Sequence, residues 1–195
     1  MKKHLGYGGF SYNGNYTGET AKSRARRIKE GWYDKFIKYP GIDIGCGIDP
    51  VDENFQLWDA IYGDNDATYM DGIPDEHYQT VFSSHLLEHI AEPVEAVRNW
   101  WRILKKSGYL IIVVPHARLY EQKPTLPSNW NRDHKWFWLP SEFELPHTLS
   151  LTHIVFEATK VKPCHVRVLD EGYEGFGLER HPGGEYSIEL VTQKV

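Results

Sequence analysis

The stretch 41–50 reads GIDIGCGIDP and holds two glycines one residue apart, directly after a run of β-prone residues. Many nucleotide-binding turns begin this way, because glycine lets a ligand approach the backbone closely. A dinucleotide-binding turn has a third glycine where Pro50 stands here, and a phosphate-binding loop needs a Lys-Ser or Lys-Thr pair that does not follow. The turn therefore predicts a ligand held against the backbone, without either phosphate-binding signature.

Carboxylates accompany this turn where a phosphate site would have cations. Asp43 precedes Gly45 by two residues, Asp59 follows Gly47 by 12 residues, and Asp66 comes next. A carboxylate repels a pyrophosphate, but it accepts hydrogen bonds from an ammonium, a ribose diol or an adenine amino group. These acids therefore favour a nucleoside ligand without phosphates.

Three histidines are candidates for a general base, since a neutral imidazole near pH 7 can accept a proton. His85 and His116 each follow a predicted strand, and His134 lies in the aromatic segment 129–138, NWNRDHKWFW. That segment is either a packed surface loop or the wall of a sugar or aromatic pocket. Asp133 faces away from His134 in any extended segment, so their adjacency does not predict a catalytic pair.

Alternating strands and helices are expected to position these residues. The spacing of apolar residues and of turn residues predicts strands over 41–44, 55–62, 79–84, 109–114, 165–170 and 186–195. It predicts helices over 21–38, 93–104 and part of 148–160, with Ser141 and Glu144 as a capping box for another short helix. The segments 1–18 and 171–185 are expected to be loops. In such an α/β protein with a mostly parallel sheet, ligands bind at the carboxyl ends of the strands, which places 45–50, 59–60, 83–85 and 115–116 on one rim.

The first predicted helix would begin after an N-cap at Thr17 and has two faces. Ile28, Trp32 and Phe36 are spaced as one apolar stripe. The other face carries cations and is predicted to be either a solvated surface or an anion clamp; its members are Lys22, Arg24, Arg26 and Arg27.

Composition limits the classes of partner. The chain has 195 residues, with 27 acidic residues against 22 lysines and arginines and a net charge of −5, which disfavours nucleic acid as a partner. Cys46 and Cys164 are far apart, and the N-terminus lacks the apolar segment of a signal peptide. We therefore expect a cytoplasmic protein with no membrane partner; the oligomeric state is not predicted.

Several pieces together resemble class I S-adenosylmethionine-dependent methyltransferases, of the small-molecule, type 11-like branch. IDIGCG resembles the glycine-rich first motif, and the segments that follow in the expected order are 63–93, GDNDATYMDGIPDEHYQTVFSSHLLEHIAEP, and 97–116, VRNWWRILKKSGYLIIVVPH. The resemblance covers roughly 41–118 and, more loosely, the last strand. It implies one Rossmann-like domain over 1–195, with helices on both faces of a mostly parallel sheet and an antiparallel last strand. Residues 1–40 would be an N-terminal loop and helix that form a possible lid, 41–118 the cofactor-binding core, and 119–195 the substrate loops and C-terminal strands.

The resemblance implies roles at matching positions, with S-adenosyl-L-methionine as cofactor. The methionine part would be cradled by Asp43, Gly45, Cys46 and Gly47. Asp59 would hold the ribose hydroxyls and Asp66 the adenine amino group, with a backbone contact from Ala67. The residues that would border the methyl group are Ser83, Ser84 and His85. Each acid also has a structural alternative, as a carboxylate that only satisfies backbone groups.

The sequence departs from the family at two places. Only 48–55 separate the first two predicted strands, fewer than the roughly ten residues that a helical crossover needs, so the first helix is expected to be shortened. Lys105-Lys106-Ser107-Gly108 replaces the family's KPGG and is expected to end the helix that precedes the fifth strand. Glu88-His89 resembles the Glu-His pair of metal-using members, but LEH is common in members without a metal, and none is expected.

The predicted activity is methyl transfer to an oxygen, or a nitrogen, of a small metabolite or sugar. The Pro-Pro motif of DNA amino-methylating enzymes is replaced by SSHL. Analogy with short family members places the acceptor in surface-polysaccharide or secondary-metabolite biosynthesis. Two rivals remain open: a NAD-dependent Rossmann enzyme, and a methyltransferase-like cofactor-binding protein without turnover.

Overall fold

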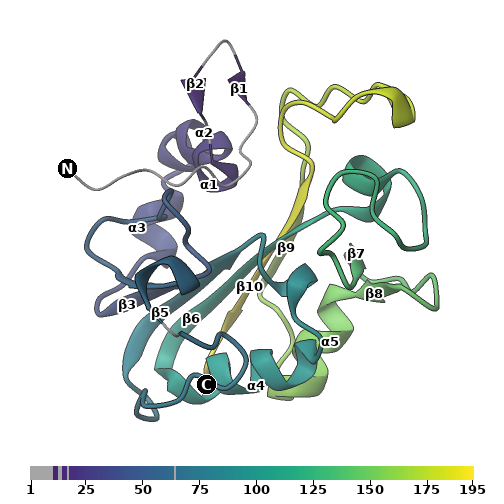
Figure 1. The fold of residues 1–195 in the computed structure, drawn as a ribbon. Helices are drawn as coiled ribbons and strands as arrows, with labels where there is room; N and C mark the ends of the chain where they lie inside the picture. The colour runs from purple at the N-terminus through teal and green to yellow at the C-terminus, as the bar shows by residue number, and fades with distance from the viewer. Residues whose placement is uncertain (1–10, 13–14, 17, 64) are drawn as a thin grey trace.

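A six-stranded sheet with the order β4-β3-β5-β6-β10-β9 lies at the centre of the computed structural model, which describes residues 11–12, 15–16, 18–63 and 65–195 (Figure 1). β3, β4, β5 and β6 run parallel, and β10 is antiparallel to both of its neighbours. This confirms the mostly parallel sheet and the antiparallel last strand. The strands are β3 (Gly41–Ile44), β4 (Gln56–Trp58), β5 (Tyr78–Ser84), β6 (Leu104–Pro115), β9 (His165–Leu169) and β10 (Ser187–Gln193).

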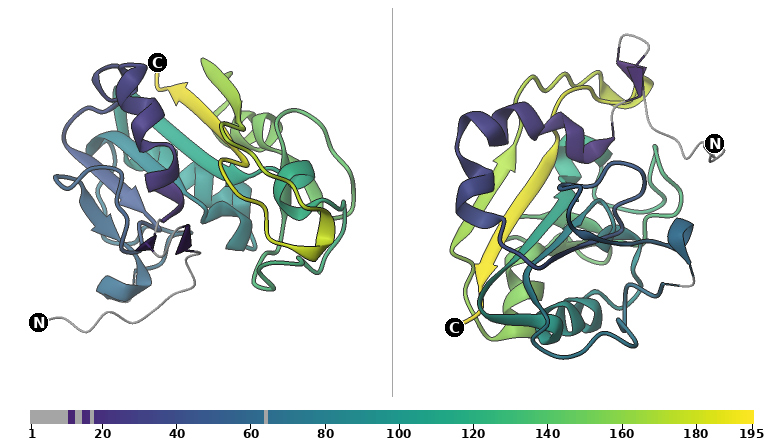
Figure 2. Two further views of the ribbon diagram at one scale, coloured as in Figure 1. Left: turned by 90° about the horizontal axis from the view of Figure 1, so that it is seen from above. Right: turned by 90° about the vertical axis from the view of Figure 1, so that its left-hand side faces the viewer.

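Helices cover both faces of this sheet, as expected (Figures 1 and 2). Alternate residues of β6 point to opposite faces, because successive strand side chains alternate. Ile111 and Val113 pack with the N-terminal helix α3 (Trp32–Phe36), which follows α2 (Arg24–Lys29) in the chain. On the opposite face, Leu110, Ile112 and Val114 pack with α4 (Pro93–Ile103) and α5 (Leu151–Thr159).

The N-terminal helix predicted over 21–38 is three short helices. They are α1 (Glu19–Lys22), α2 and α3, with breaks at Ser23 and at Gly31, whose φ is 66°. The left-handed backbone at Gly31 changes the direction of the chain, so Trp32 is 4% exposed while Ile28 is 66% exposed. The prediction of one continuous apolar stripe is therefore wrong for Ile28, which does not share the buried face of Trp32 and Phe36. The predicted cap at Thr17 lies outside the described residues.

Arg26 and Arg27 of the cationic face point inward, which corrects the prediction of a solvated face or anion clamp for these two residues. Arg24 is exposed and pairs with Asp49 at 3.3 Å. Arg27 pairs with Glu189 of β10 at 2.8 Å, and both side chains are 1% exposed. Arg26 pairs with Glu185 at 3.1 Å. Arg26 and Arg27 are buried because carboxylates of the sheet and of the preceding loop compensate their charge.

No helix lies between β3 and β4, so the shortened crossover is confirmed. Residues 45–55 form turns, in which Val51 and Phe55 are buried in the cluster that also holds Trp32. A Cβ at Gly41 would lie 2.2 Å from the Phe55 ring, so the loop packs tightly against β3. The predicted second strand is shorter than 55–62, because its end forms the 3₁₀ turn η1 (Ala60–Tyr62).

Four local predictions need correction. Residues 141–144 form no helix; this region holds the short parallel pair β7 (Phe137–Leu139) and β8 (Thr148–Ser150). α4 ends at Ile103, and 105–108 belong to β6, where a Cβ at Gly108 would meet the carbonyl oxygen of Gln79 at 2.7 Å. The N-terminal segment contains a small antiparallel pair, β1 (Ser11–Tyr12) with β2 (Asn15–Tyr16). The loop 171–185 contains η4 (Gly177–Glu179) and an antiparallel bridge.

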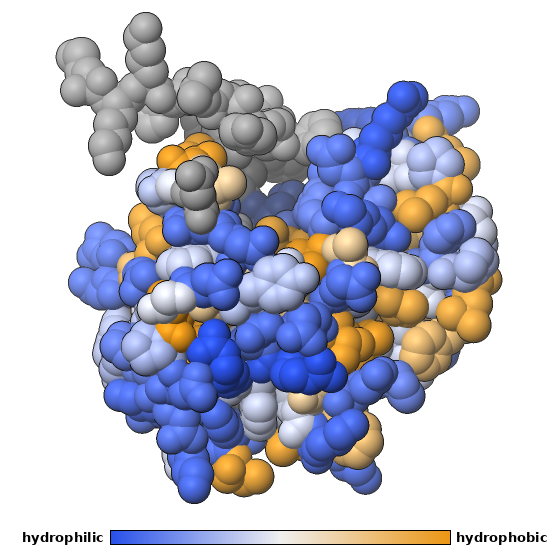
Figure 3. All heavy atoms as spheres, turned by 60° about the horizontal axis from the view of Figure 1, so that its bottom comes forward, coloured by the Kyte–Doolittle hydropathy of each residue, from blue (hydrophilic) through white to orange (hydrophobic). Residues whose placement is uncertain are grey.

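The surface offers no sign of a large apolar face on the side shown in Figure 3. Hydrophilic residues dominate this side, and the hydrophobic ones lie in small separate groups. Among the described residues, no helix is long and apolar enough to cross a membrane.

Candidate active site

The glycine turn after β3 lies against the segment that follows β5. Gly45 has a φ of 74°, and a Cβ there would lie 2.7 Å from the Leu86 side chain. Gly47 has a φ of 51°. Both positions favour glycine, since other residues rarely adopt this backbone conformation. At Gly45 the space beside the backbone is occupied by Leu86, whereas a Cβ at Gly47 would meet nothing within 4 Å.

Asp59 follows β4 and lies at the same turn. Its Oδ2 accepts a hydrogen bond from the Gly47 N–H at 2.9 Å, and its Oδ1 accepts one from the Ile61 N–H at 3.0 Å. The half-buried carboxylate therefore links the glycine turn to η1 and keeps further acceptor capacity. The Tyr62 hydroxyl donates to the Gly47 carbonyl at 2.9 Å and supports the same turn.

Asp43 lies beneath the turn and is 1% exposed. Its Oδ2 accepts from the Val51 N–H at 2.7 Å, while its Oδ1 has no hydrogen-bond partner among the described residues. Burial raises the pKa of this carboxyl to about 7. Burial also raises the pKa of the Cys46 thiol to about 12, so this cysteine stays protonated and is a poor nucleophile.

Asp66 lies in a turn of its own. Its exposed carboxylate accepts from the Thr68 and Tyr69 N–H groups at 2.6 and 3.0 Å. The Ala67 carbonyl accepts from the Trp100 indole at 2.7 Å. Trp58 of β4 donates to the Asp66 carbonyl at 3.1 Å, which holds this turn beside the end of β4.

Ser83, Ser84 and His85 end β5 where the resemblance placed them. Ser83 is buried, and its hydroxyl has no hydrogen-bond partner among the described residues. The His85 ring lies between two hydroxyls, Ser84 Oγ at 3.1 Å from Nδ1 and Ser187 Oγ at 3.0 Å from Nε2. Burial lowers the pKa of His85 to about 4, although Glu19 at 3.6 Å acts in the opposite direction.

His134 lies in a buried pair with Glu121. The distance from its Nδ1 to Glu121 Oε1 is 2.6 Å, and its Nε2 faces Glu88 Oε1 at 4.0 Å. Burial alone would lower the pKa of His134, but the hydrogen bond to Glu121 and the charge of Glu88 raise it overall. Asp133 is exposed, and its charge also raises the pKa of His134.

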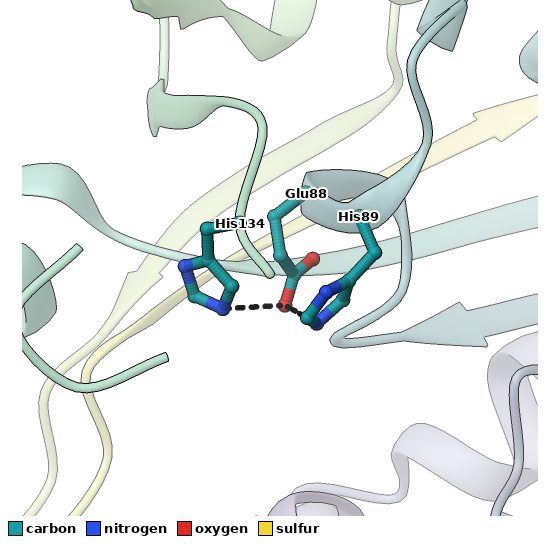
Figure 4. Close-up of side chains that lie close together, drawn as sticks. All are labelled: Glu88, His89 and His134. Carbon is teal, nitrogen blue, oxygen red and sulfur yellow. Dashed lines mark ion pairs between the residues drawn. The ribbon is translucent and has the colours of Figure 1, made fainter. Parts of the chain in front are cut away.

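One cavity of about 120 Å³ brings these groups together. Glu88 and His89 come from η2 (Leu87–His89), and Figure 4 shows both side chains directed toward His134. The cavity is lined by Glu19, His85, Glu88, His89, Pro115, Tyr120, Asn131, His134, His181 and Tyr186. His116 is not part of this lining; its Nδ1 accepts from the Arg118 N–H at 3.1 Å, at the start of η3 (Ala117–Glu121).

Sequence reasoning missed several of these groups. Glu121 lies at the end of η3, and nothing in its neighbourhood marks it as the partner of His134. Glu19 and Tyr186 come from opposite ends of the chain, and the Tyr186 hydroxyl donates to Glu19 Oε1 at 2.6 Å. Their sequence separation hides this contact. The only available signal was the abundance of His, Glu and Tyr in segments without periodicity.

α1 covers one side of the glycine turn. The Ala21 N–H donates to Asp49 Oδ2 at 2.8 Å, and Lys22 donates to the Tyr186 hydroxyl at 2.5 Å. The first of the N-terminal helices therefore connects the turn with the cavity.

Comparison with known proteins agrees with this arrangement. A family model described as "Methyltransferase domain" matches residues 46–112, about a third of the chain. No curated protein matches the sequence significantly. A methyltransferase from Thermotoga maritima, described as a possible histamine N-methyltransferase, superposes with a TM-score of 0.51 at 14% identity, over 89% of this chain and 99% of its own.

Two further structures show the same fold. An S-adenosylmethionine-dependent methyltransferase from Archaeoglobus fulgidus has a TM-score of 0.50 at 16% identity, over 90% of this chain and 94% of its own. A structure titled for the conversion of a disulfide bond into a thioacetal group during echinomycin biosynthesis has a TM-score of 0.57 at 13% identity, over 88% and 80%. At these identities the likeness establishes the fold. The domain match begins within the glycine turn, at residue 46, and includes the cavity residues His85, Glu88 and His89.

Proposed function

Because the chain carries a methyltransferase domain and has the fold of the S-adenosylmethionine-dependent methyltransferases, we propose that it transfers a methyl group from S-adenosylmethionine to an oxygen, or a nitrogen, of a small polar acceptor. One observation carries this proposal. The glycine turn, with the Asp59 carboxylate bonded to Gly47, lies on the same rim as the polar cavity behind β5. A cofactor cradle and an acceptor pocket must adjoin for in-line methyl transfer.

The residues at the turn suit a cofactor without phosphates. Asp59 has acceptor capacity for ribose hydroxyls, and the unpartnered Oδ1 of Asp43 can accept from the ammonium group of the methionine part. Asp66 is exposed beside the end of β4, where its carboxylate would meet the adenine amino group only by leaving its own turn. The Gly45, Cys46 and Gly47 backbone completes this cradle.

The cavity supports a small acceptor. Its volume is about 120 Å³, and it is lined mainly by histidines, carboxylates and tyrosine hydroxyls, a lining that suits a hydroxylated or amino compound. Ser83 and Ser84 end β5 directly before His85, which lines the cavity. His85 is placed to take the proton that the acceptor loses when its oxygen displaces the sulfonium sulfur, while His134 and Glu88 orient the acceptor. Family analogy favours a metabolite or sugar of surface-polysaccharide or secondary-metabolite biosynthesis.

Calorimetry tests the cofactor assignment. The wild-type protein should bind S-adenosylmethionine and S-adenosylhomocysteine, and NADH should not bind. Asp59→Ala should weaken binding of S-adenosylhomocysteine by about 1–3 kcal/mol, because it removes a charged acceptor from the ribose and from Gly47. Asp34→Ala on the exposed side of α3 is the matched control and should leave affinity unchanged.

The results separate three functions. Binding of NADH without S-adenosylhomocysteine would favour the dehydrogenase alternative and overturn the proposal. Cofactor binding without release of S-adenosylhomocysteine, on a panel of sugars, polyols and amines, would favour the binding protein without turnover. An Asp59→Ala protein with wild-type affinity would remove this acid from the cofactor site.

A further inference from the structure

A triad of donor atoms in the cavity is unexplained by the packing. Glu88, His89 and His134 each offer one ligand atom, and these atoms lie within 4.8 Å of one another. The His89 Nε2 to Glu88 Oε1 distance is 3.9 Å, and the His134 Nε2 to Glu88 Oε1 distance is 4.0 Å (Figure 4). These separations are too long for direct hydrogen bonds, so the three groups face one another without satisfying one another.

The tautomer of His134 sharpens this observation. Its Nδ1 lies 2.6 Å from Glu121 Oε1, a carboxylate oxygen that can only accept when ionised. The proton of a neutral ring therefore lies on Nδ1, and Nε2 presents a lone pair to the Glu88 carboxylate. A cation between these two acceptors would satisfy both, as would a second proton on the His134 ring. The Glu121–His134 contact is also the arrangement that orients metal-ligating histidines in proteins.

The charge balance of the buried acids points in the same direction. Glu185 and Glu189 are paired with Arg26 and Arg27. Glu88 and Glu121 are both 1% exposed, and in the described part of the chain their ion-pair partners are histidines alone. Among the described residues, the buried Oε2 atom of Glu88 has no hydrogen-bond partner. A buried carboxyl group is stable when its charge is compensated or when it carries a proton, and a bound cation would supply the compensation here.

We propose that Glu88, His89 and His134 bind a divalent transition-metal ion, with Glu121 as the positioning residue for His134. Two imidazole nitrogens and one carboxylate oxygen suit Zn²⁺, Co²⁺, Mn²⁺ or Fe²⁺, whereas Mg²⁺ and Ca²⁺ prefer sites made of oxygen alone. In a tetrahedral site with bonds of about 2.1 Å, donor atoms lie about 3.4 Å apart, so the side chains need to approach by only about an ångström. This inference reverses the expectation from the sequence that no metal takes part.

Three protein ligands leave at least one coordination position open, as in catalytic metal sites. The cavity lined by Tyr120 and Asn131 adjoins the triad. An acceptor hydroxyl bound there would become more acidic and a better nucleophile, a consequence that rests on the proposed function. Binding of the ion itself does not rest on it.

Titration with Co²⁺ tests the site directly, because its visible absorption reports the coordination geometry. An untagged protein freed of metal by a chelator should bind one equivalent of Co²⁺, with an intense band typical of tetrahedral or five-coordinate sites, and Zn²⁺ should displace it. Mg²⁺ at the same concentration should not. Binding of Co²⁺ should also raise the melting temperature.

Variants assign the ligands. Each of the single variants Glu88→Gln, His89→Ala and His134→Ala should abolish the band. Glu88→Gln keeps the size of the side chain. Glu121→Gln should weaken Co²⁺ binding by about 10–100-fold and keep the band, as expected of a residue that acts through His134. His153→Ala is the control, since this histidine is 57% exposed on α5, away from the cavity.

Two results would overturn the proposal. One is a wild-type protein that binds no Co²⁺ while remaining folded and able to bind S-adenosylhomocysteine, which would leave a protonated His134 as the compensating charge. The other is a Co²⁺ band that persists in folded Glu88→Gln and His89→Ala proteins. Failure to bind S-adenosylhomocysteine alongside stoichiometric Co²⁺ binding would instead count against the proposed function alone.

Discussion

Replacement of Glu189 by glutamine should cost the protein about 3 kcal/mol of stability. Glu189 Oε2 accepts from Arg27 at 2.8 and 3.2 Å, and Oε1 accepts from the Trp32 indole at 2.9 Å. Burial opposes ionisation, yet the contacts with His165 and Arg27 lower the pKa of Glu189 from 4.5 to about 2. The difference between these two pKa values corresponds to about 3 kcal/mol, at about 1.4 kcal/mol for each pKa unit. Loss of one partner of a buried pair costs about 3–5 kcal/mol, in agreement.

The dependence on pH follows from the direction of this shift. A carboxyl with a lowered pKa in the folded state contributes stability above its unfolded pKa of 4.5, and this contribution is lost as pH falls through about 2. Urea unfolding at pH 7 should therefore show the full loss for Glu189→Gln, and the difference from wild type should shrink below pH 4.5. The melting temperature should fall by about 6–12 °C.

A matched control and a double variant make the reasoning refutable. Glu157→Gln removes an exposed acid of α5 that pairs with His153 at 3.9 Å, and should cost less than about 1 kcal/mol. Arg27→Met combined with Glu189→Gln should recover part of the loss, because no unpaired charge then remains buried. If Glu189→Gln cost no more than Glu157→Gln, the buried pair would not be what anchors the N-terminal helices.

Gly45→Ala should destabilise the protein by about 1–3 kcal/mol in urea unfolding, because its Cβ would meet Leu86 at 2.7 Å and the residue has a φ of 74°. Gly183→Ala is the control, since its Cβ would have only contacts of 3.7 Å or more. Equal losses of stability in the two variants would contradict the crowded turn. Asp43→Asn should flatten the pH dependence of stability. Burial raises the pKa of Asp43 from 3.8 to about 7, so the folded protein retains a proton that the unfolded chain has lost. The free energy of unfolding of the wild type therefore falls as pH rises from about 4 to 7. An Asp43→Asn protein whose stability falls over this range as steeply as the wild type would contradict that origin.

The sheet could be predicted because its signals are local. The uninterrupted apolar run of β6 and the Pro93 start of α4 each depend on a few neighbouring residues. The glycine turn is equally local, and the positive φ of Gly45 and Gly47 agrees with its reading as a ligand turn. The direction of Arg26 and Arg27 could not be predicted, because their partners Glu185 and Glu189 lie more than 150 residues away.

The cavity was only half predictable for the same reason. His85 and His134 were recognised as reactive types, yet what distinguishes His134 is Glu121, a partner on a separate turn. The helix predicted at Ser141 failed because local capping signals were outweighed by pairing of β7 with β8. Tertiary contacts decided each of these outcomes.

The contrast between two groups of buried acids indicates which part of the molecule is functional. At Glu185 and Glu189, permanently charged guanidinium groups compensate the carboxylates, and His165 is a further neighbour of Glu189 at 3.6 Å. At Glu88 and Glu121 the neighbours are histidines, whose charge depends on protons and ligands. A purely structural site would gain nothing from a compensating group that can lose its charge. We therefore infer that the cavity behind β5 is the place where the protein exchanges protons or binds a cation, next to the turn that would hold its cofactor.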